Sequence, residues 1–207
     1  MLHLQRDVGF WAGGDESGPL LFDLIGTDAV TSLGGRRLTK TTSNNYATGR
    51  SARGRSAGKW YFEAVKSAGP VGSSSGAIIG LCQASQNLGS NPSAALLGLS
   101  GPSYGYASWN GFIYFNGNQM VAGSTWSDRV GCAVDLTAKK IWFHNGGTWQ
   151  FAGSNPATGA GGTNLDPSVF DLPMFAACGV YAVSPADSMD FIQAGSELYK
   201  PAGFLSW

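Results

Sequence analysis

Residues 133–150 read "AVDLTAKKIWFHNGGTWQ", and this stretch decides the fold class. It joins two apolar, strand-like runs, 130–136 and 140–144, through the short segment "TAKK". Asn145-Gly146 follows the second run, and this dipeptide readily adopts the positive φ angles of a tight turn. We therefore predict a β-hairpin in which Asp135 ends the first strand and its carboxylate bonds backbone amides of the "TAKK" turn.

Catalytic residue patterns are weak in this chain. His144 has only His3 as a second histidine, and no Gly-x-Ser-x-Gly elbow occurs. Two carboxylates on one face of a strand would stand two residues apart, whereas Asp187 and Asp190 stand three apart and Glu63 has no acidic neighbour. We interpret His144 as a hairpin-edge residue and predict no enzymatic activity. A sandwich-fold glycan-degrading enzyme using the two aspartates is the weakest alternative.

Short runs rich in β-branched and aromatic residues occur along most of the chain, bounded by Gly, Pro, Asn or Ser. The runs are 59–65, 77–82, 103–109, 112–115, 130–136, 140–144, 174–182 and 188–193, with two weaker strands within 36–51. Residues 91–99 could hold one or two helical turns. Many short strands without a fixed repeat predict an all-β sandwich or closed barrel.

Charge and hydropathy narrow the possible partners. Charged residues make up 13% of the chain and the formal net charge is zero, which argues against a nucleic-acid partner. The one basic cluster, "RSARGR" at 50–55, is interpreted as a solvated loop leading into a strand. No stretch of 18 apolar residues occurs, so we predict no membrane insertion.

The cysteines and the glycine-rich segment indicate neither a metal nor a cofactor. Cys82, Cys132 and Cys178 each lie within an apolar run, and their odd number and wide spacing favour buried free thiols. The segment "GSNPATGAGG" at 153–162 lacks the lysine and the following helix of a phosphate-binding loop. We interpret it as a long flexible hairpin loop and predict no cofactor and no metal site.

Residues 1–25 differ from the rest, because exposed-type apolar residues there flank a Gly-Asp-Glu-Ser-Gly stretch. We predict an N-terminal arm or docking segment at 1–25 and a compact domain at 26–207. Exposed apolar residues on an arm need a partner. The predicted docking residues are Phe10, Trp11, Leu20, Leu21 and Phe22.

Aromatic residues dominate the strands. Alternation places Tyr61 on the face opposite Trp60 and Phe62, so that part of each set lies in the core and part on the outer face or under a loop. Trp126 and Trp149 stand in turn-like settings and are the better candidates for partner contact. Trp149 either packs under the "NPATG" loop or contacts the partner.

Five motifs in order resemble a SPRY (B30.2-like) domain over about residues 30–205. They are "SAGKWYFEAVKSAG" (56–69), "AIIGLCQAS…LG" (77–89), "SYGYASWNGFIYFNG" (103–117), "WSDRVGCAVDLTAKKIWFHNGGTWQ" (126–150) and "MFAACGVY…SMDFIQAG" (174–195). The resemblance implies a bent antiparallel two-sheet β-sandwich, related to the concanavalin-like jelly roll.

Within that family, "WQFAGSNPATGAGG" and the ending "YKPAGFLSW" look like the subset from tailed bacteriophages. This resemblance implies a virion protein, made in the host bacterial cytoplasm, that forms part of a tail fibre or another appendage. The implied partners are other virion structural proteins and a host cell-surface glycan or protein. A homotrimer is common among fibres, although no heptad pattern enforces one. A purely architectural head or tail protein is the alternative.

Related SPRY adaptors hold short peptides in a pocket, and the resemblance carries two of its motifs to this chain. The pocket tyrosine matches Tyr114 in "FIYFNG". The second motif, Val-Trp-Gly in the family, falls at Val180, Tyr181 and Ala182, where Tyr replaces Trp and Ala replaces Gly. We keep this surface as a candidate binding site and assign no ligand to it from the sequence.

Overall fold

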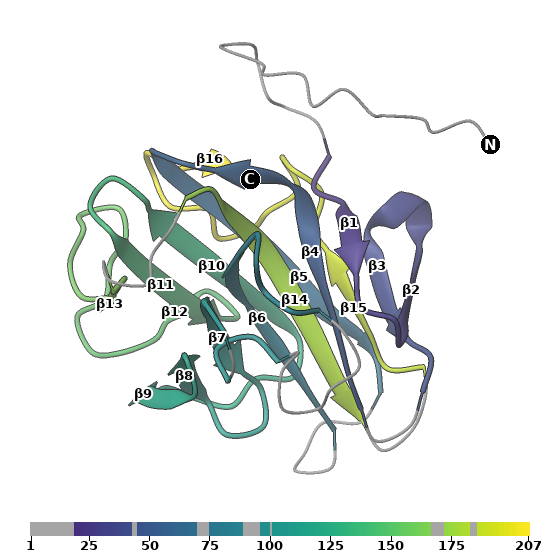
Figure 1. The fold of residues 1–207 in the computed structure, drawn as a ribbon. Coiled ribbons are helices and arrows are strands. Elements are labelled where there is room, and N and C mark those ends of the chain that lie inside the picture. The colour runs from purple at the N-terminus through teal and green to yellow at the C-terminus, as the bar shows by residue number, and fades with distance from the viewer. Residues whose placement is uncertain are drawn as a thin grey trace.

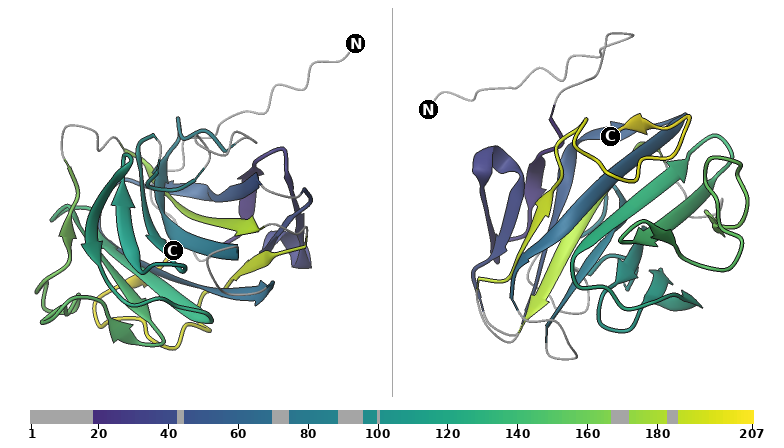
Figure 2. Two further views of the ribbon diagram at one scale, coloured as in Figure 1. Left: turned by 90° about the horizontal axis from the view of Figure 1, so that it is seen from below. Right: turned by 180° about the vertical axis from the view of Figure 1, so that it is seen from behind.

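Two β-sheets face each other in the computed structural model, which describes residues 19–42, 45–69, 75–88, 96–99, 101–166, 172–182 and 186–207. Figure 1 shows the strands of the two sheets stacked in layers, and Figure 2 shows the same layers from below and from behind. All strand pairs are antiparallel except that of β5 with β16 near the C-terminus. The predicted two-sheet antiparallel sandwich is confirmed.

The first sheet, sheet A, has seven strands in the order β1-β4-β14-β6-β7-β8-β9. In this order the strands are Phe22–Ile25, Asn45–Arg55, Met174–Ala182, Ser75–Gln83, Ser103–Ala107, Phe112–Phe115 and Asn118–Ala122. The free edges of this sheet are therefore β1 and β9 within the described residues.

The second sheet, sheet B, runs β12-β11-β10-β5-β15-β3-β2, with β13 beside β11 and β16 beside β5. Its strands are β2 Ala29–Ser32, β3 Arg37–Lys40, β5 Lys59–Ala68, β10 Arg129–Asp135, β11 Lys140–Asn145, β12 Thr148–Trp149, β13 Thr163–Asn164, β15 Ser188–Phe191 and β16 Leu205–Ser206. Across the described ranges the only helix is the three-residue 3-10 turn η1, Leu33–Gly35. A helix able to cross a membrane is not found among these residues.

The hairpin predicted from residues 133–150 forms as β10 and β11. The amide of Ala138 donates to Asp135 Oδ1 at 2.8 Å, which confirms that Asp135 braces the turn. Each predicted strand run contains a strand, whereas β1, β2, β9 and the two-residue strands were not predicted. Part of the predicted helical segment lies outside the described residues, and 96–99 form a turn in which Leu99 N donates to Leu96 O at 3.2 Å.

The core follows the alternation of side chains along the strands. Phe62 on β5 belongs to the cluster between the sheets, and Trp60 packs against that cluster. Tyr61 instead lies with Ala133 and Trp142 on the outer face of sheet B, covered by Phe204 of the C-terminal segment. The predicted division of faces is thus confirmed, and all three cysteines are buried free thiols, as predicted.

Two segments interpreted as loops are more ordered than we expected. Residues 50–55 lie within β4, where the Arg55 guanidinium is buried and stacks 3.8 Å from the centroid of the Trp60 ring. A flat guanidinium can lie on an aromatic ring, which is how an arginine-rich run fits a strand. In the glycine-rich segment Asn155 and Ala160 form a β-bridge, and Trp142 Nε1 donates to Ala160 O at 2.8 Å.

The predicted boundary between the arm and the domain, at residue 25, does not coincide with the beginning of sheet A. Residues 22–25 form β1, which pairs with β4 inside sheet A. Leu20 is 4% exposed and Phe22 is 5% exposed, and the Phe22 ring stacks on Phe191 at 4.0 Å. The side chains expected on an exposed arm are therefore held by the domain's own core, while Leu21 is half-buried. The other two predicted docking residues, Phe10 and Trp11, lie outside the described residues.

Candidate functional site

The five predicted contact residues lie in three different parts of the molecule. Tyr114 and Tyr181 both lie on the outer face of sheet A. Val180 and Trp126 are buried in the core between the sheets, at 0% and 2% exposure. Trp149 lies on the outer face of sheet B. One pair of the five residues thus forms a shared surface.

Trp126 is a correction to the sequence analysis. Its turn-like setting predicted an exposed ring, but the segment folds inward, where Trp126 N donates to Ser108 O at 3.3 Å and the ring lies 6.1 Å from that of Tyr106. Val180 is a second correction, because it alternates with Tyr181 along β14 and therefore faces the core. Neither side chain is available to a partner.

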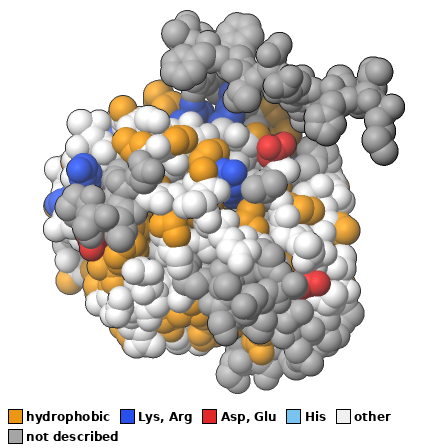
Figure 3. Space-filling view, viewed as in Figure 1, with side chains coloured by type: hydrophobic (Ala, Val, Ile, Leu, Met, Phe, Trp, Pro, Cys, Tyr) orange, Lys and Arg blue, Asp and Glu red, His pale blue; other side chains and the backbone are white. Residues whose placement is uncertain are grey.

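A group of aromatic rings lies on the outer face of sheet A, and each ring is half-buried or nearly buried. We call this group the aromatic surface. Its members are Tyr46, Trp109, Phe112, Tyr114 and Tyr181. They face outward because their strand neighbours, including Ala47 and Ile113, point into the core. Figure 3 views the molecule from the side of sheet A and shows, on its described part, hydrophobic side chains among polar ones with few charges.

The register of three strands brings these rings together. Tyr46 and Tyr181 are cross-strand partners, with ring centroids 4.6 Å apart. Gly76 is the partner of Tyr181 on β6, and Trp109 lies over it, since a Cβ built on Gly76 would stand 2.4 Å from the Trp109 ring. Trp109 and Tyr114 follow, with centroids 6.4 Å apart. A row of rings therefore crosses the sheet, and Tyr46 and Trp109 are members that sequence reasoning missed.

Neutral polar groups frame this row. Asn110 Nδ2 and Gln119 Nε2 donate to the Tyr114 hydroxyl oxygen at 2.6 Å and 3.2 Å. Because that oxygen accepts both bonds, its own proton is left to donate outward. Burial raises the pKa of Tyr46, and its tyrosine neighbours add to the effect, so this phenol is neutral at physiological pH. The surface can stack on flat or apolar groups and form neutral hydrogen bonds.

A separate cluster of polar side chains lies on the outer face of sheet B, beneath the C-terminal segment. Tyr61 Oη lies 2.6 Å from Glu63 Oε1 and 2.5 Å from His144 Nε2. Arg129 pairs with Glu63 Oε2 at 2.5 Å, and the amides of Leu198 and Tyr199 donate to Oε1 at 3.0 Å and 2.8 Å. Glu63 and His144 are 0% exposed. The cluster fastens the C-terminal segment to the sheet.

The pKa shifts follow from this burial. Burial lowers the pKa of His144 to about 4, although Glu63 acts in the opposite direction. Burial would raise the pKa of Glu63, but hydrogen bonds from Tyr61, Arg129 and the two amides outweigh it and hold the pKa below its usual value. His144 is therefore a neutral, fully enclosed residue, which corrects our interpretation of it as a hairpin-edge residue.

Trp149 packs against His144 and Tyr61 rather than under the "NPATG" loop, and contact of its ring with a partner stays a prediction. Its half-buried ring meets His144 edge-on at 4.9 Å and lies 6.3 Å from Tyr61. The loop at 153–162 is contacted by Trp142 instead. Trp149 thus closes one side of the polar cluster.

The two aspartates considered for catalysis are both engaged with basic residues. Asp190 accepts two hydrogen bonds from Arg37, each at 2.7 Å. Asp187 is 2% exposed and lies 3.8 Å from Lys66 Nζ. They form no open carboxylate pair, and no group of three or more potential metal ligands occurs among the described residues.

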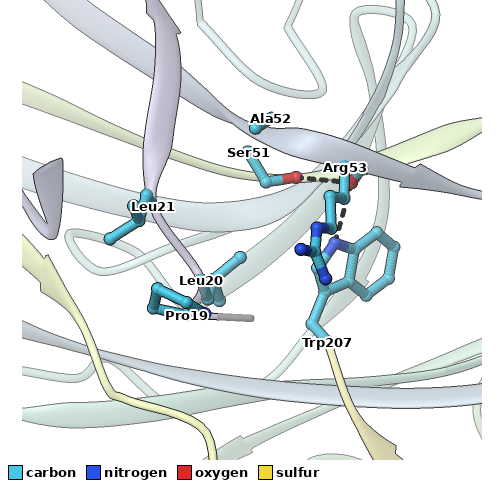
Figure 4. Close-up of a pocket in the computed structure, with 7 residues that line it drawn as sticks. All are labelled: Pro19, Leu20, Leu21, Ser51, Ala52, Arg53 and Trp207. Atoms are coloured by element: carbon cyan, nitrogen blue, oxygen red, sulfur yellow. Dashed lines mark hydrogen bonds between the residues drawn. The ribbon is translucent and has the colours of Figure 1, made fainter. Parts of the chain in front are cut away.

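A small cavity lies where the described chain begins. It is lined by Pro19, Leu20, Leu21, Ser51, Ala52, Arg53 and Trp207, and Figure 4 shows the Trp207 indole bonded to Arg53 O. Its volume of about 180 Å³ is below the roughly 300–1,000 Å³ of ligand sites. It has room for one side chain.

Comparison with known proteins places this geometry in context. A family model described as the SPRY domain matches residues 59–171. The SPRY domain of human HERC1 has a TM-score of 0.57 at 14% identity, covering 82% of this chain and 94% of that one. Another human SPRY domain has a TM-score of 0.58 at 17% identity, covering 85% and 100%. The stonustoxin structure gives 0.58 at 13% identity, covering 84% and 28%. No curated protein matches.

Proposed function

Because the chain belongs to the SPRY domain family, whose members are typically protein–protein interaction modules, we propose that it is a non-enzymatic binding module that recognises its partner through the aromatic surface. The family gives the kind of function. The choice of surface comes from the side chains that this chain places on the outside of sheet A. A ligand for it is proposed below by its chemistry.

The row of Tyr46, Tyr181, Trp109 and Tyr114 is the observation that supports this choice. Tyrosine and tryptophan supply large contact areas with a polar group at the edge, and they dominate the binding energy of many interfaces. Here the rings are held in place by strand register and by the hydrogen bonds to Tyr114, so little conformational entropy is lost when a partner binds. A preorganised surface of this kind suits recognition.

We also propose that the protein has no enzymatic activity, because the residues of the polar cluster are closed off. Its Glu63 and His144 are enclosed and bonded within the protein, and a catalytic group needs access to its substrate. The weaker alternative, a glycan-degrading enzyme, would be supported by carbohydrate turnover that Asp187→Ala or Asp190→Ala abolishes.

We place this module in a bacteriophage particle, as part of a tail fibre or another appendage. The support is the resemblance of 149–162 and 199–207 to phage sequences. In the fold, 153–162 contacts Trp142 and 199–207 covers Tyr61, so both segments complete sheet B. Residues 1–18, with Phe10 and Trp11, would dock on neighbouring virion proteins. An architectural head or tail protein without a host ligand is the second candidate.

Host-cell adsorption and glycan-array binding of the full chain test this function. Trp109→Ala and Tyr181→Ala should each weaken binding at least tenfold, whereas Leu198→Ala, a control at a 66% exposed residue of the C-terminal segment over the other sheet, should leave it unchanged. Mass spectrometry of purified particles tests the location. Presence in particles without host binding would favour the architectural role, and absence from particles would contradict the phage assignment.

A further inference from the structure

Strand β9 is an open edge of sheet A beside the aromatic surface. All five residues of Asn118–Ala122 are exposed, including Met120 at 39% and Val121 at 40%. Figure 1 shows β9 at the border of the sheet, with β8 on one side of it. The strand has no charged residue and no proline, two of the devices with which natural proteins protect such edges, and its pairing with β8 contains a β-bulge.

The other edge strands are less available. Of these, β1 has four residues and includes Asp23, and β12 has two residues. Strand β2 also has four residues, and Ala29 among them is buried. Strand β9 is thus the longest edge strand in the described part of the chain and the only one whose residues are all exposed.

The hairpin geometry identifies the backbone groups that face outward. Asn116 and Gly117 have φ angles of 46° and 81° and form a two-residue turn, which makes Phe115 and Asn118 a hydrogen-bonded pair. Hydrogen-bonded and non-hydrogen-bonded pairs alternate along an antiparallel ladder. The next pair, which contains Gln119, is therefore not hydrogen-bonded, and Gln119 directs its N–H and C=O away from β8. At the far end Gly123 N donates to Gly111 O at 2.6 Å, and the same alternation directs those of Ala122 outward. The two residues are three apart rather than two, because the register with β8 shifts by one residue between them, so an added strand would have to follow this bulge.

We propose that β9 binds an extended, uncharged peptide segment of the partner by β-strand addition. This inference rests on the proposed function, because the added strand would lie next to the aromatic surface. Gln119 connects strand β9 to the aromatic surface, since its side chain already donates to the Tyr114 hydroxyl. Main-chain hydrogen bonds to β9 would supply affinity, and side chains on the outer face of the added strand would reach the rings and supply specificity.

Charge and area decide which occupant fits. Because β9 has no charged side chain, a charged segment would be desolvated without compensation, and an uncharged segment is favoured. A second copy joined through β9 alone would pair two five-residue strands about 17 Å long, and stable interfaces bury roughly 1,200–2,000 Å². A peptide gains the aromatic surface in addition to the strand, which favours it over a second copy.

The test uses the full chain as bait for a displayed library of random twelve-residue peptides. Peptides rich in uncharged, β-forming residues should be selected. Ala122→Pro removes one outward donor while leaving the bonds to β8, and it should weaken binding about fivefold to tenfold. Met120→Lys adds an edge charge and should also weaken it. Val30→Lys on β2, at a residue 50% exposed, is the matched control and should change affinity less than twofold.

Circular dichroism melts establish whether each variant folds, and Met120→Lys decides the result if Ala122→Pro does not fold. Binding lost in Trp109→Ala but retained in both β9 variants would overturn strand addition while leaving the proposed function standing. Binding retained in all three would overturn both, and selection of no peptide would overturn strand addition alone. A dimer in sedimentation analysis that Met120→Lys dissociates would identify a second copy as the occupant and overturn the peptide proposal.

Discussion

The hydroxyl of Tyr61 joins His144 to Glu63 in a single directed chain of hydrogen bonds. The amide of Gly147 donates to His144 Nδ1 at 3.1 Å, so Nδ1 is an acceptor and the proton is on Nε2. Nε2 then donates to Tyr61 Oη at 2.5 Å, and Tyr61 donates to Glu63 Oε1 at 2.6 Å. Every donor in this buried chain has an acceptor only while His144 is neutral and Glu63 is ionised.

Acid should therefore destabilise the domain through His144. Its pKa is about 4 in the folded protein, against 6.5 ordinarily, so between these values only the unfolded chain binds the proton. Stability is full above pH 6.5 and falls as the pH decreases, at up to about 1.4 kcal/mol per pH unit and by roughly 3 kcal/mol in total. Urea unfolding at pH 7, 6, 5 and 4 measures this slope.

His144→Gln should flatten the slope, because glutamine has no proton to gain in this range. His3→Gln, at the other histidine of the chain, is the control and should retain the slope. Glu63 does not affect the slope between pH 7 and pH 5, because its pKa is lowered in the folded protein and its contribution is lost only as the pH falls through and below the ordinary range of a glutamate. An unchanged slope in His144→Gln would show that another group causes the acid sensitivity.

Removing the charge of Glu63 should loosen the C-terminal segment. Glu63→Gln leaves Arg129 without its carboxylate and weakens the acceptor of the Leu198 and Tyr199 amides. Breaking a buried ion pair costs about 3–5 kcal/mol, and the lower end applies because the Arg129 side chain is 24% exposed. Urea unfolding gives the free energy, and hydrogen exchange should be faster at the two amides.

Glu197→Gln is the matched control for this experiment. Glu197 accepts a hydrogen bond from the exposed amide of Gly195 at 2.6 Å, so we expect a loss below about 0.5 kcal/mol. Equal losses in the two variants would mean that the cluster does not hold the segment.

The turn between β10 and β11 gives a separate prediction, with a smaller expected loss of stability. Asp135→Ala removes the acceptor of the Ala138 amide and should cost about 1 kcal/mol in urea unfolding. Lys59 lies 3.8 Å from the same carboxylate, but its side chain is 42% exposed, so Lys59→Ala should cost less than about 0.5 kcal/mol. A larger effect of Lys59→Ala would assign the stabilisation to the ion pair rather than to the turn.

Local patterns predicted much of this fold. Alternation placed Phe62 and Tyr61 on opposite faces, and Asn145-Gly146 indicated a turn after β11, which lies one residue further on at Gly146-Gly147 with φ angles of 54° and 88°. The polar cluster could not be predicted, because Tyr61 and His144 are 83 residues apart and meet only through the register of β5, β10 and β11. Gly131 was its one signal, since a Cβ there would stand 2.1 Å from His144 Nε2.

Only part of the aromatic surface could be predicted, again because its residues meet through long-range strand pairing. Tyr114 and Tyr181 were found through the family resemblance, but their neighbours Tyr46 and Trp109 join them only through strand order in sheet A. Trp126 failed as a prediction because turn-like residues around a tryptophan do not reveal whether the segment folds over the core. Burial of an aromatic in a loop is decided by tertiary packing.

Gly76 links the fold to the proposed binding function and provides the last prediction. A methyl group in Gly76→Ala would stand 2.4 Å from Trp109 Cε3, so the indole must move out of the row. Trp109 is half-buried and can move toward solvent, so we expect a stability loss of about 1–2 kcal/mol. Host adsorption should fall as much as in Trp109→Ala. Gly179→Ala crowds Thr48 Oγ1 at 2.9 Å in the same sheet without touching a ring, and it should retain binding. Full binding by Gly76→Ala, with the near-ultraviolet circular dichroism of the displaced indole changed, would mean that the position of Trp109 does not matter for recognition.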